Sequence, residues 1–390
     1  MKIALFSWES LHSIPVGGLA IHVTELAAAL QRMGNEVHVF TRIGQNQKIY
    51  EVIDGVHYHR CPFAFNSNFV YEMTHNMCKS MAHYFFESEN YGGAFDIIHG
   101  HDWHVVCALD EIKRARNKKV VFTLHSTQYG RDGNNFHNGA AKDILNTEWY
   151  GTYIANRVIV CSHTMKEEVM RLHRVPEWKM RVIPNGIWAN KFDGFVDAWQ
   201  DVKRHFGFGV YDPLITFVGR MTVQKGPDLL LEAVPDVLKD FPKAKFIFIG
   251  DGDMKSQLEK RARDLGVSHS VVFTGYIPDD WKTKIMKASE CVVVPSRNEP
   301  FGIVVLEAWS CYKPVLATHG TGAGELIWHN VTGYRVYQAP NSIAWGIKEI
   351  LRNPEHARWM GKNGRFAAEK EFTWDKVAEK TLNVYKEVLG

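Results

Sequence analysis

The sequence predicts an α/β protein built from two doubly wound Rossmann-like domains in succession, with a cleft between them. Short apolar runs alternate with amphipathic stretches along most of the 390 residues. This alternation pauses over residues 188–213 and then resumes. A chain of this length also exceeds one ordinary hydrophobic core, so two domains are expected.

The first domain is predicted to span residues 1–190. Its opening run, "KIALFS" (2–7), is typical of a buried parallel strand. A glycine loop, an amphipathic helix ending at Gly34 and the run "EVHVFT" (36–41) complete a βαβ unit. Further strands are predicted at 96–100, 119–125, 157–162 and 180–187.

A second α/β series follows an aperiodic stretch, so residues 191–212 are interpreted as a linker and 213–370 as the second domain. Strands are predicted at 214–220, 245–252, 271–276, 291–296 and 313–318. Helices are predicted at 226–239, 254–265, 279–288 and from about 302. The last stretch, 340–390, is helical and is broken at Pro354.

Charge and cysteine content exclude several classes of protein. A formal net charge of +3, with scattered basic residues, gives no support for nucleic-acid binding. No apolar run of about 18 residues and no signal peptide are apparent, so a cytoplasmic protein is expected. The six cysteines are dispersed without a C-x-x-C pair, which indicates reduced thiols and no zinc site.

The first candidate site residues, Gly17 and Gly18, lie between the first strand and helix. In doubly wound sheets, ligands bind beyond the carboxyl ends of the strands. Glycines there let the backbone approach a ligand and leave N–H groups free for an anion, although a loop needing positive φ explains them equally well. The loop lacks the P-loop and dinucleotide-binding motifs.

Histidines follow two predicted strands of the first domain. His125 ends "VVFTLH" and could donate a hydrogen bond or exchange a proton, although an isolated histidine at a strand end is more often structural. "HGHDWH" (99–104) shows no second ligand group, so a metal site is disfavoured. Trp103 is expected to stack on a sugar or to pack in the core.

Two cations follow the first strand of the second domain. Arg220 and Lys225 lie in "GRMTVQKG", where a guanidinium fork and an ammonium would suit a diphosphate. A solvated loop is the usual alternative for cations so close in sequence.

Two carboxylates, Glu299 and Glu307, bracket an apolar run in "RNEPFGIVVLEAW" (297–309). A helix is predicted to begin near 301–303, with Glu299 just before it and Glu307 on its second turn. The backbone N–H groups at the helix start belong to Phe301, Gly302 and Ile303. Such a combination suits a phosphorylated sugar. A capping acid plus an exposed helix glutamate is the alternative.

These motifs resemble a known family. "EPFGIVVLE" (299–307) resembles the E-x7-E motif of retaining glycosyltransferases with the GT-B fold, and its surroundings are most similar to glycosyltransferase family 4. Further segments occur in the expected order and carry the resemblance over nearly the whole chain: "VIPNGI", "FVGRMTVQKG", "FIGDGDMK", "FTGYIPDD" and "GTGAGELIWHNVTGY".

In the first domain, the resemblance implies that Gly17 and Gly18 approach the phosphates or sugar of a nucleotide-sugar donor. His125 would lie by the donor sugar. The final helix would return to this domain, so residues 371–390 would complete it.

In the second domain, the resemblance implies that Arg220 and Lys225 bind the diphosphate and offset the charge on the leaving nucleotide. Glu299 would hold hydroxyls of the transferred sugar, and Glu307 the ribose hydroxyls. The backbone around Tyr276 and Ile277 would hold the base. Catalysis would require neither a metal nor a cofactor.

For the substrates, "HDWH" (101–104) and "PVGGL" (15–19) resemble starch and glycogen synthases. Those enzymes carry lysine two positions before the glycine pair, where this chain has Pro15. The leading expectation is retaining transfer of a hexose, with glucose as first candidate, from UDP- or ADP-glucose to a carbohydrate such as an α-glucan.

Three alternatives stay open. One is transfer to a lipid or cell-surface precursor with another donor such as GDP-mannose. It would need membrane association, which helix 164–175 supports weakly because it mixes acids with bases. Another is a non-catalytic nucleotide-sugar-binding module. The third, an oxidoreductase, is disfavoured by the missing dinucleotide fingerprint. The oligomeric state is not predicted.

Overall fold

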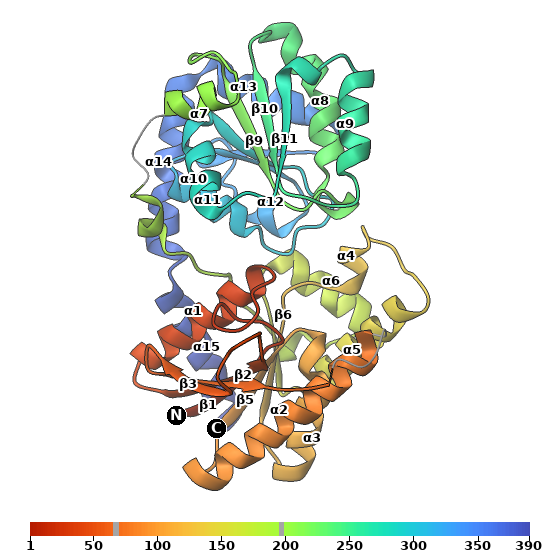
Figure 1. Cartoon of the computed structure of the whole chain (residues 1–390), viewed down its shortest axis with the longest axis vertical. Coiled ribbons are helices and arrows are strands. Elements are labelled where there is room, and N and C mark those ends of the chain that lie inside the picture. The colour runs from red at the N-terminus through yellow and green to blue at the C-terminus, as the bar shows by residue number, and fades with distance from the viewer. Residues whose placement is uncertain (65–69, 195–198) are drawn as a thin grey trace. The chain divides into compact units, whose positions relative to one another are not determined.

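The computed structural model describes residues 1–64, 70–194 and 199–390, and these form two compact α/β units (Figure 1). The first unit contains Met1–Tyr129, Phe136–Gly186 and Trp374–Gly390, and the second contains Gly130–Asn135 and Ile187–Thr373. The predicted class, two α/β domains with mainly parallel sheets, is confirmed.

The first unit has an eight-stranded sheet in the order β3-β4-β2-β1-β5-β6-β7-β8. Only β3 and β4 pair antiparallel among its described strands. The strands are β1 Lys2–Phe6, β2 Glu36–Arg42, β3 Tyr50–Ile53, β4 Val56–Cys61, β5 Ile97–His101, β6 Val120–Leu124, β7 Arg157–Val160 and β8 Met180–Val182. The helices are α1 Gly18–Arg32, α2 Val70–Gly92, α3 Val106–Arg116, α4 Gln128–Arg131, α5 Ala140–Ile154, α6 His163–His173 and α15 Trp374–Leu389. The last two residues of α4 are assigned to the second unit.

The central strands of this sheet are apolar and fully buried, as expected for parallel strands covered on both faces. Phe6 of β1 stacks on Phe40 of β2 with ring centroids 5.0 Å apart. The strands β3 and β4 were not predicted. They form a hairpin whose turn, Asp54-Gly55, has positive φ at both residues, as a two-residue type I′ turn requires.

The C-terminal helix α15 packs on α1 within the first unit. Its first residue, Trp374, is buried against Gly186. A Cβ atom on Gly186 would lie 2.7 Å from the Trp374 ring and 2.9 Å from its backbone nitrogen. The glycine of "VIPNGI" is therefore required for the return of the chain to this unit.

The second unit has a six-stranded parallel sheet in the order β11-β10-β9-β12-β13-β14. The strands are β9 Leu214–Val218, β10 Lys245–Ile249, β11 Val271–Gly275, β12 Cys291–Val294, β13 Val315–Thr318 and β14 Gly333–Val336. The helices are α7 Trp199–His205, α8 Pro227–Asp240, α9 Lys255–Asp264, α10 Asp279–Ala288, α11 Ile303–Ser310, α12 Gly322–Leu326, α13 Pro340–Arg352 and α14 Pro354–Glu371. Helices α8 and α9 lie to one side of the sheet, and α7, α10 and α11 to the other (Figure 1).

The stretch 191–212 is not a linker in its described part. Val202 of α7 and Phe208 are buried with Leu214 and Ile285 in one hydrophobic cluster. The reason is that α7 covers the sheet beside α10, so this segment belongs to the second unit. Residues 195–198 of the predicted linker lie outside the described residues.

Short 3₁₀ turns complete the second unit and shape its loops: η3 Ala189–Phe192, η4 Val223–Lys225 and η5 Ser268–Ser270. In the first unit they are η1 Trp103–Val105 and η2 Glu177–Lys179. Among the described residues, no helix combines the length and apolar character needed to cross a membrane.

Candidate active site

The predicted residues of the second unit gather at one edge of its sheet. Arg220, Tyr276 and Glu299 follow β9, β11 and β12, and all strands of this sheet run parallel. The chain winds outward from β9 in one direction and from β12 in the other, so these adjacent strands flank the topological switch point. Open α/β sheets bind ligands at that position.

Lys225 and Glu299 meet there in an ion pair. The Nζ atom of Lys225 lies 2.7 Å from Oε2 of Glu299, which also accepts a hydrogen bond from Ser296 at 3.3 Å. Gly226 directs the chain after Lys225 because its φ is 64° and a Cβ there would lie 2.3 Å from the carbonyl oxygen of Pro295. The loops after β9 and β12 are therefore held together by close backbone packing as well as by the ion pair.

A second contact fixes the same two loops. The Arg297 guanidinium donates to both carboxylate oxygens of Asp228, at 2.9 and 2.6 Å. The backbone N–H of Arg297 also donates to the carbonyl oxygen of Gln224 at 2.8 Å. Arg297 was not predicted as a site residue, and its contacts hold the loop that carries Lys225 in place. Arg220 is exposed nearby, and its guanidinium reaches Gln224 at 3.4 Å.

Helix α11 begins at Ile303, as predicted, with Gly302 at its N-cap in a left-handed conformation. Phe301 is buried, whereas Ile303 is half-buried. At Gly302 a Cβ would lie 2.8 Å from the Cβ of Ala323. The start of α11 thus packs closely against α12, which fixes the direction of its first N–H groups.

Glu307 is only 9% exposed and has a cationic partner that the sequence did not indicate. Lys282 of α10 contacts Oε1 of Glu307 and Oδ1 of Asp279, both at 2.9 Å. Burial lowers the pKa of Lys282, but attraction to the two carboxylates outweighs burial and raises it overall. The exposed-glutamate alternative is therefore wrong for Glu307.

Tyr276 and Ile277 follow β11 at the same edge, where Tyr276 is 84% exposed and Ile277 half-buried. Gly250, after the neighbouring β10, donates its N–H to the carbonyl oxygen of Gly275. Gly250 also approaches Gly219 so closely that a Cβ would lie 2.1 Å from the carbonyl oxygen. Because these residues are glycines, they put no side chains into the space between the ends of β9, β10 and β11.

In the first unit, Gly17 is the N-cap of α1 and Gly18 is its first residue. Both are exposed, and a Cβ on Gly17 would meet no atom. The N–H groups of Val16 and Gly17 are not free, however, because they donate to Oε2 of Glu9 at 2.8 and 3.1 Å. Burial raises the pKa of Glu9. The expectation that the Gly17 N–H is free for an anion is thus wrong in this conformation.

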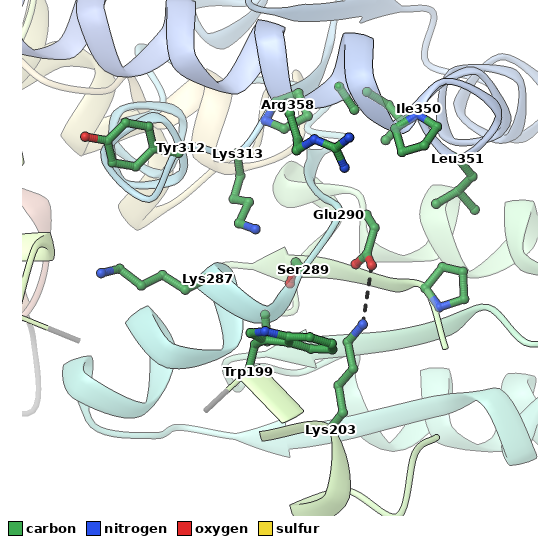
Figure 2. Close-up of a pocket in the computed structure, with 15 residues that line it drawn as sticks. Trp199, Lys203, Lys287, Ser289, Glu290, Tyr312, Lys313, Ile350, Leu351 and Arg358 are labelled. Carbon is green, nitrogen blue, oxygen red and sulfur yellow. Dashed lines mark hydrogen bonds and ion pairs between the residues drawn. The ribbon is translucent and has the colours of Figure 1, made fainter. Parts of the chain in front are cut away.

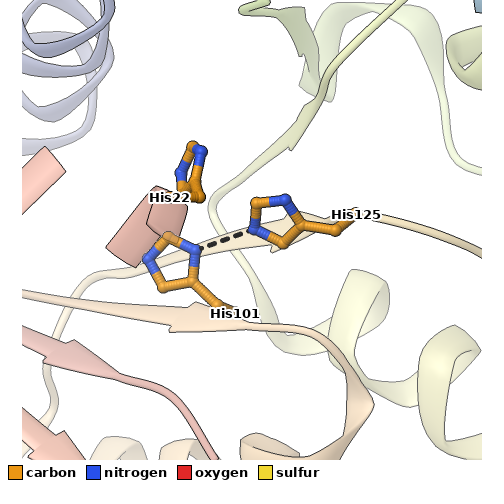
Figure 3. A group of neighbouring side chains, drawn as sticks. All are labelled: His22, His101 and His125. Carbon is orange, nitrogen blue, oxygen red and sulfur yellow. Dashed lines mark hydrogen bonds between the residues drawn. The ribbon is translucent and has the colours of Figure 1, made fainter. Parts of the chain in front are cut away.

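His125 follows β6 and belongs to a cluster of imidazoles with His22 and His101 (Figure 3). Its Nε2 lies 3.1 Å from Nδ1 of His101, and its ring packs edge-on against His22 at 4.4 Å. Nδ1 of His22 lies 2.8 Å from the side-chain oxygen of Asn185. Burial lowers the pKa of His125 to about 3 and also lowers those of His22 and His101. All three rings are therefore neutral near pH 7.

Three imidazoles converge in this cluster. The sequence of residues 99–104 alone had shown no second group of ligands. One ligand atom from each ring lies within 4.8 Å of the others. His22 was not predicted because it lies in α1, far from His101 and His125 in the sequence. Its one available signal was its position four residues after Gly18, one helical turn away on the same face.

Asp102 holds the backbone of His125. Its Oδ1 atom accepts the His125 N–H at 2.8 Å, and its own φ is 60°, a conformation that non-glycine residues rarely adopt. Trp103 is buried and stacks on His104 with centroids 4.0 Å apart. Of the two expectations for Trp103, core packing is confirmed.

Comparison with solved structures defines the class of fold. Sucrose-phosphate synthase from Thermosynechococcus elongatus is similar over 99% of this chain and 98% of its own, with 24% identity and a TM-score of 0.81. The Anabaena protein HepE, solved in complex with UDP-glucose, is similar over 99% and 100%, with 18% identity and a TM-score of 0.77. The fold is GT-B.

The sequence matches are more specific. Residues 200–366 match the family Glycosyl transferases group 1, and residues 16–190 match Glycosyltransferase Family 4. An uncharacterized glycosyltransferase of Methanocaldococcus jannaschii is 37% identical over 392 residues, which cover 99% of this chain and 98% of the relative. Glycogen synthase of Mycobacterium tuberculosis is 26% identical, over 99% and 94%. The chain belongs to glycosyltransferase family 4.

Proposed function

We propose that the protein is a retaining glycosyltransferase that moves a hexose, with glucose as first candidate, from UDP- or ADP-glucose to a carbohydrate acceptor such as an α-glucan. The ion pair between Lys225 and Glu299, at the switch point and beside the N-terminus of α11, carries this proposal. It brings together a cation for the leaving diphosphate and a carboxylate for sugar hydroxyls. The names of the similar glycogen and sucrose-phosphate synthases support glucose.

In the proposed reaction, the bond between the anomeric carbon and the diphosphate oxygen breaks. The acceptor oxygen forms its bond on the same face, and the acceptor proton passes to an oxygen of the leaving phosphate. Arg220 and Lys225 offset the charge that grows on the diphosphate, so they stabilise the transition state more than the ground state. N–H groups at Phe301, Gly302 and Ile303 add the positive end of α11.

The other residues bind and orient the donor in this proposal. Glu299 accepts hydrogen bonds from hydroxyls of the transferred sugar, and the backbone at Tyr276 and Ile277 holds the base. In the first unit, Gly17 and Gly18 allow close approach of the donor. His125 donates a hydrogen bond as a neutral imidazole, since burial disfavours its charged form. No metal or cofactor takes part.

The proposal is tested with a panel of UDP-, ADP- and GDP-linked glucose, galactose, mannose and N-acetylglucosamine, in the presence of EDTA. A donor at about 100 times its Kd stabilises the folded protein by about 2.7 kcal/mol, so the Tm is expected to rise by roughly 5 °C or more. UDP- or ADP-glucose should give this shift and slow release of nucleotide. A response to GDP-mannose alone would overturn the choice of donor, and a Tm shift without any release of nucleotide would favour the non-catalytic module. No response at all would contradict the proposed donors and the module alike.

Glu307→Ala is expected to weaken donor binding tenfold or more, because the carboxylate is proposed to accept hydrogen bonds from the ribose and such charged hydrogen bonds contribute about 1.5–3 kcal/mol each. Isothermal titration calorimetry with the responding nucleotide measures the loss. The matched control is Lys282→Met, which breaks the same ion pair but keeps the carboxylate. If both variants lose affinity equally, Glu307 acts only through the ion pair.

A further inference from the structure

A hollow lies at the edge of the second unit's sheet opposite to the candidate active site (Figure 2). It measures about 500 Å³ and is bordered by Pro213, Glu290 and Pro314, the residues directly before β9, β12 and β13. These are the amino ends of the strands, whereas the candidate active site lies at their carboxyl ends. The five residues of β9 separate the two edges by about 16 Å.

Cationic side chains dominate this hollow. Lys313, from the turn before β13, extends toward its middle, with Arg358 of α14 on one side and Trp199 on the other (Figure 2). Lys287 of α10 lines a further side. Within the described chain, the half-buried ammonium of Lys313 makes no hydrogen bond or ion pair, and burial lowers its pKa. Arg358 has one ion-pair contact, at 4.0 Å, with the exposed Glu355.

Glu290 is the carboxylate that lines this hollow, and both of its oxygens already have partners within the protein. Its Oε1 atom pairs with Lys203 at 3.3 Å, and its Oε2 atom accepts the backbone N–H of Leu214 at 3.0 Å. Lys203 donates in addition to the carbonyl oxygen of Asp212 at 2.7 Å. The charges of Glu290 and Lys203 therefore offset each other, and the remaining cations give the hollow a positive potential.

Two aromatic side chains complete the lining. Trp199 is 41% exposed and Tyr312 is 49% exposed. Tyr312 has a φ of 60°, which is costly for a bulky residue and is tolerated only where the surrounding structure imposes it. A cation lies over one face of each ring, Lys203 at 5.2 Å from the Trp199 centroid and Arg365 at 5.0 Å from that of Tyr312. The exposed parts of the two rings are suited to the C–H faces of a sugar ring.

We propose that this hollow binds a phosphorylated sugar, with Lys313 and Arg358 holding the phosphate monoester and Trp199 and Tyr312 contacting the sugar. An ammonium and a guanidinium together suit a phosphate, and the volume accommodates a hexose phosphate. The site is separate from the candidate active site, and this inference does not rest on the proposed transfer reaction.

The test is isothermal titration calorimetry with glucose 6-phosphate, inorganic phosphate and glucose, in saturating UDP and again in saturating ADP so that the candidate active site is filled. Wild-type protein is expected to bind glucose 6-phosphate in both. The double variant Lys313→Gln/Arg358→Gln should lose about tenfold or more in affinity. The matched control Lys260→Gln/Arg263→Gln removes the same charges from the exposed face of α9 and should bind like wild type.

Three results would overturn the proposal: no binding to wild type, equal affinity in the double variant and the control, or complete displacement by UDP or ADP. Binding of glucose as tight as that of glucose 6-phosphate would also contradict the role of the cations. Circular dichroism and Tm establish that the variants fold. If the double variant does not fold, Lys313→Gln alone serves, because it removes a half-buried unpaired charge and should not lower the Tm.

Discussion

Replacing Lys225 with alanine is expected to lower kcat by at least about a hundredfold at saturating donor, the scale observed when one group that stabilises developing charge is removed. In the proposed reaction, charge accumulates on the leaving diphosphate. Lys225 is a partly buried cation that lies 2.7 Å from Glu299, the carboxylate proposed to bind the sugar. Steady-state kinetics with the donor identified in the panel measure both kcat and KM.

The variant also removes a partner of Glu299, so this indirect effect needs its own control. Ser296→Ala removes another hydrogen bond to the same Oε2 atom without changing any charge. It is expected to change kcat by about tenfold or less, because the bond is long at 3.3 Å and a hydrogen bond to a charged group contributes about 1.5 kcal/mol at the weak end of its range. Near wild-type turnover of Lys225→Ala would remove Lys225 from the mechanism, and an equal loss in Ser296→Ala would assign it only a positioning role.

Lowering the pH from 7.5 to 5.5 is expected to destabilise the first unit by roughly 8 kcal/mol. Six buried histidines cause this loss, and burial lowers the pKa of each: His22, His38, His59, His99, His101 and His125. The folded state keeps the rings neutral while the unfolded chain titrates near pH 6.5. The stabilisation is therefore complete above pH 6.5 and is lost as the pH falls below it toward the folded pKa values.

The size of this effect follows from the number of rings. Each contributes about 1.4 kcal/mol per pH unit below the unfolded pKa. Urea unfolding at a series of pH values measures the free energy of unfolding. His99→Gln should reduce the pH dependence by one ring's share, whereas His269→Gln, at an exposed histidine of the second unit, should leave it unchanged. A flat profile between pH 7.5 and 5.5 would show that these histidines are not neutral and buried in solution.

Much of the fold could be predicted because most strands of both sheets are buried and parallel, so they appear as continuous apolar runs. The predicted strands all correspond to observed ones. The strands β3 and β4 were missed because β3 is a half-exposed edge strand and β4 is rich in histidine and tyrosine. Their signal was the Asp54-Gly55 turn. The strand β14 was also missed, because it has only four residues and begins at a glycine. Gly333 is required there, since a Cβ would lie 1.9 Å from the carbonyl oxygen of Val315.

The candidate site was predictable only in part, for a physical reason. Residues such as Lys225 and Glu299 could be found from their places after strands, since chain order fixes which edge of a sheet they occupy. Their partners depend on tertiary packing. Lys282 reaches Glu307 from another helix, and Glu9 reaches Gly17 across the loop that joins β1 to α1. Periodicity carries no information on such pairings.

The placement of α15 has a consequence for how the chain is made. The first unit contains both the beginning and the end of the sequence, with Trp374 buried in it and Asp375 paired with Arg32 of α1. During translation, the α1 surface that α15 covers stays uncovered until the whole second unit has left the ribosome, a delay of tens of seconds at typical elongation rates. Nascent chains are thus exposed to aggregation through the α1 face, and a ribosome-stalled chain ending before Trp374 would be a natural client for a chaperone.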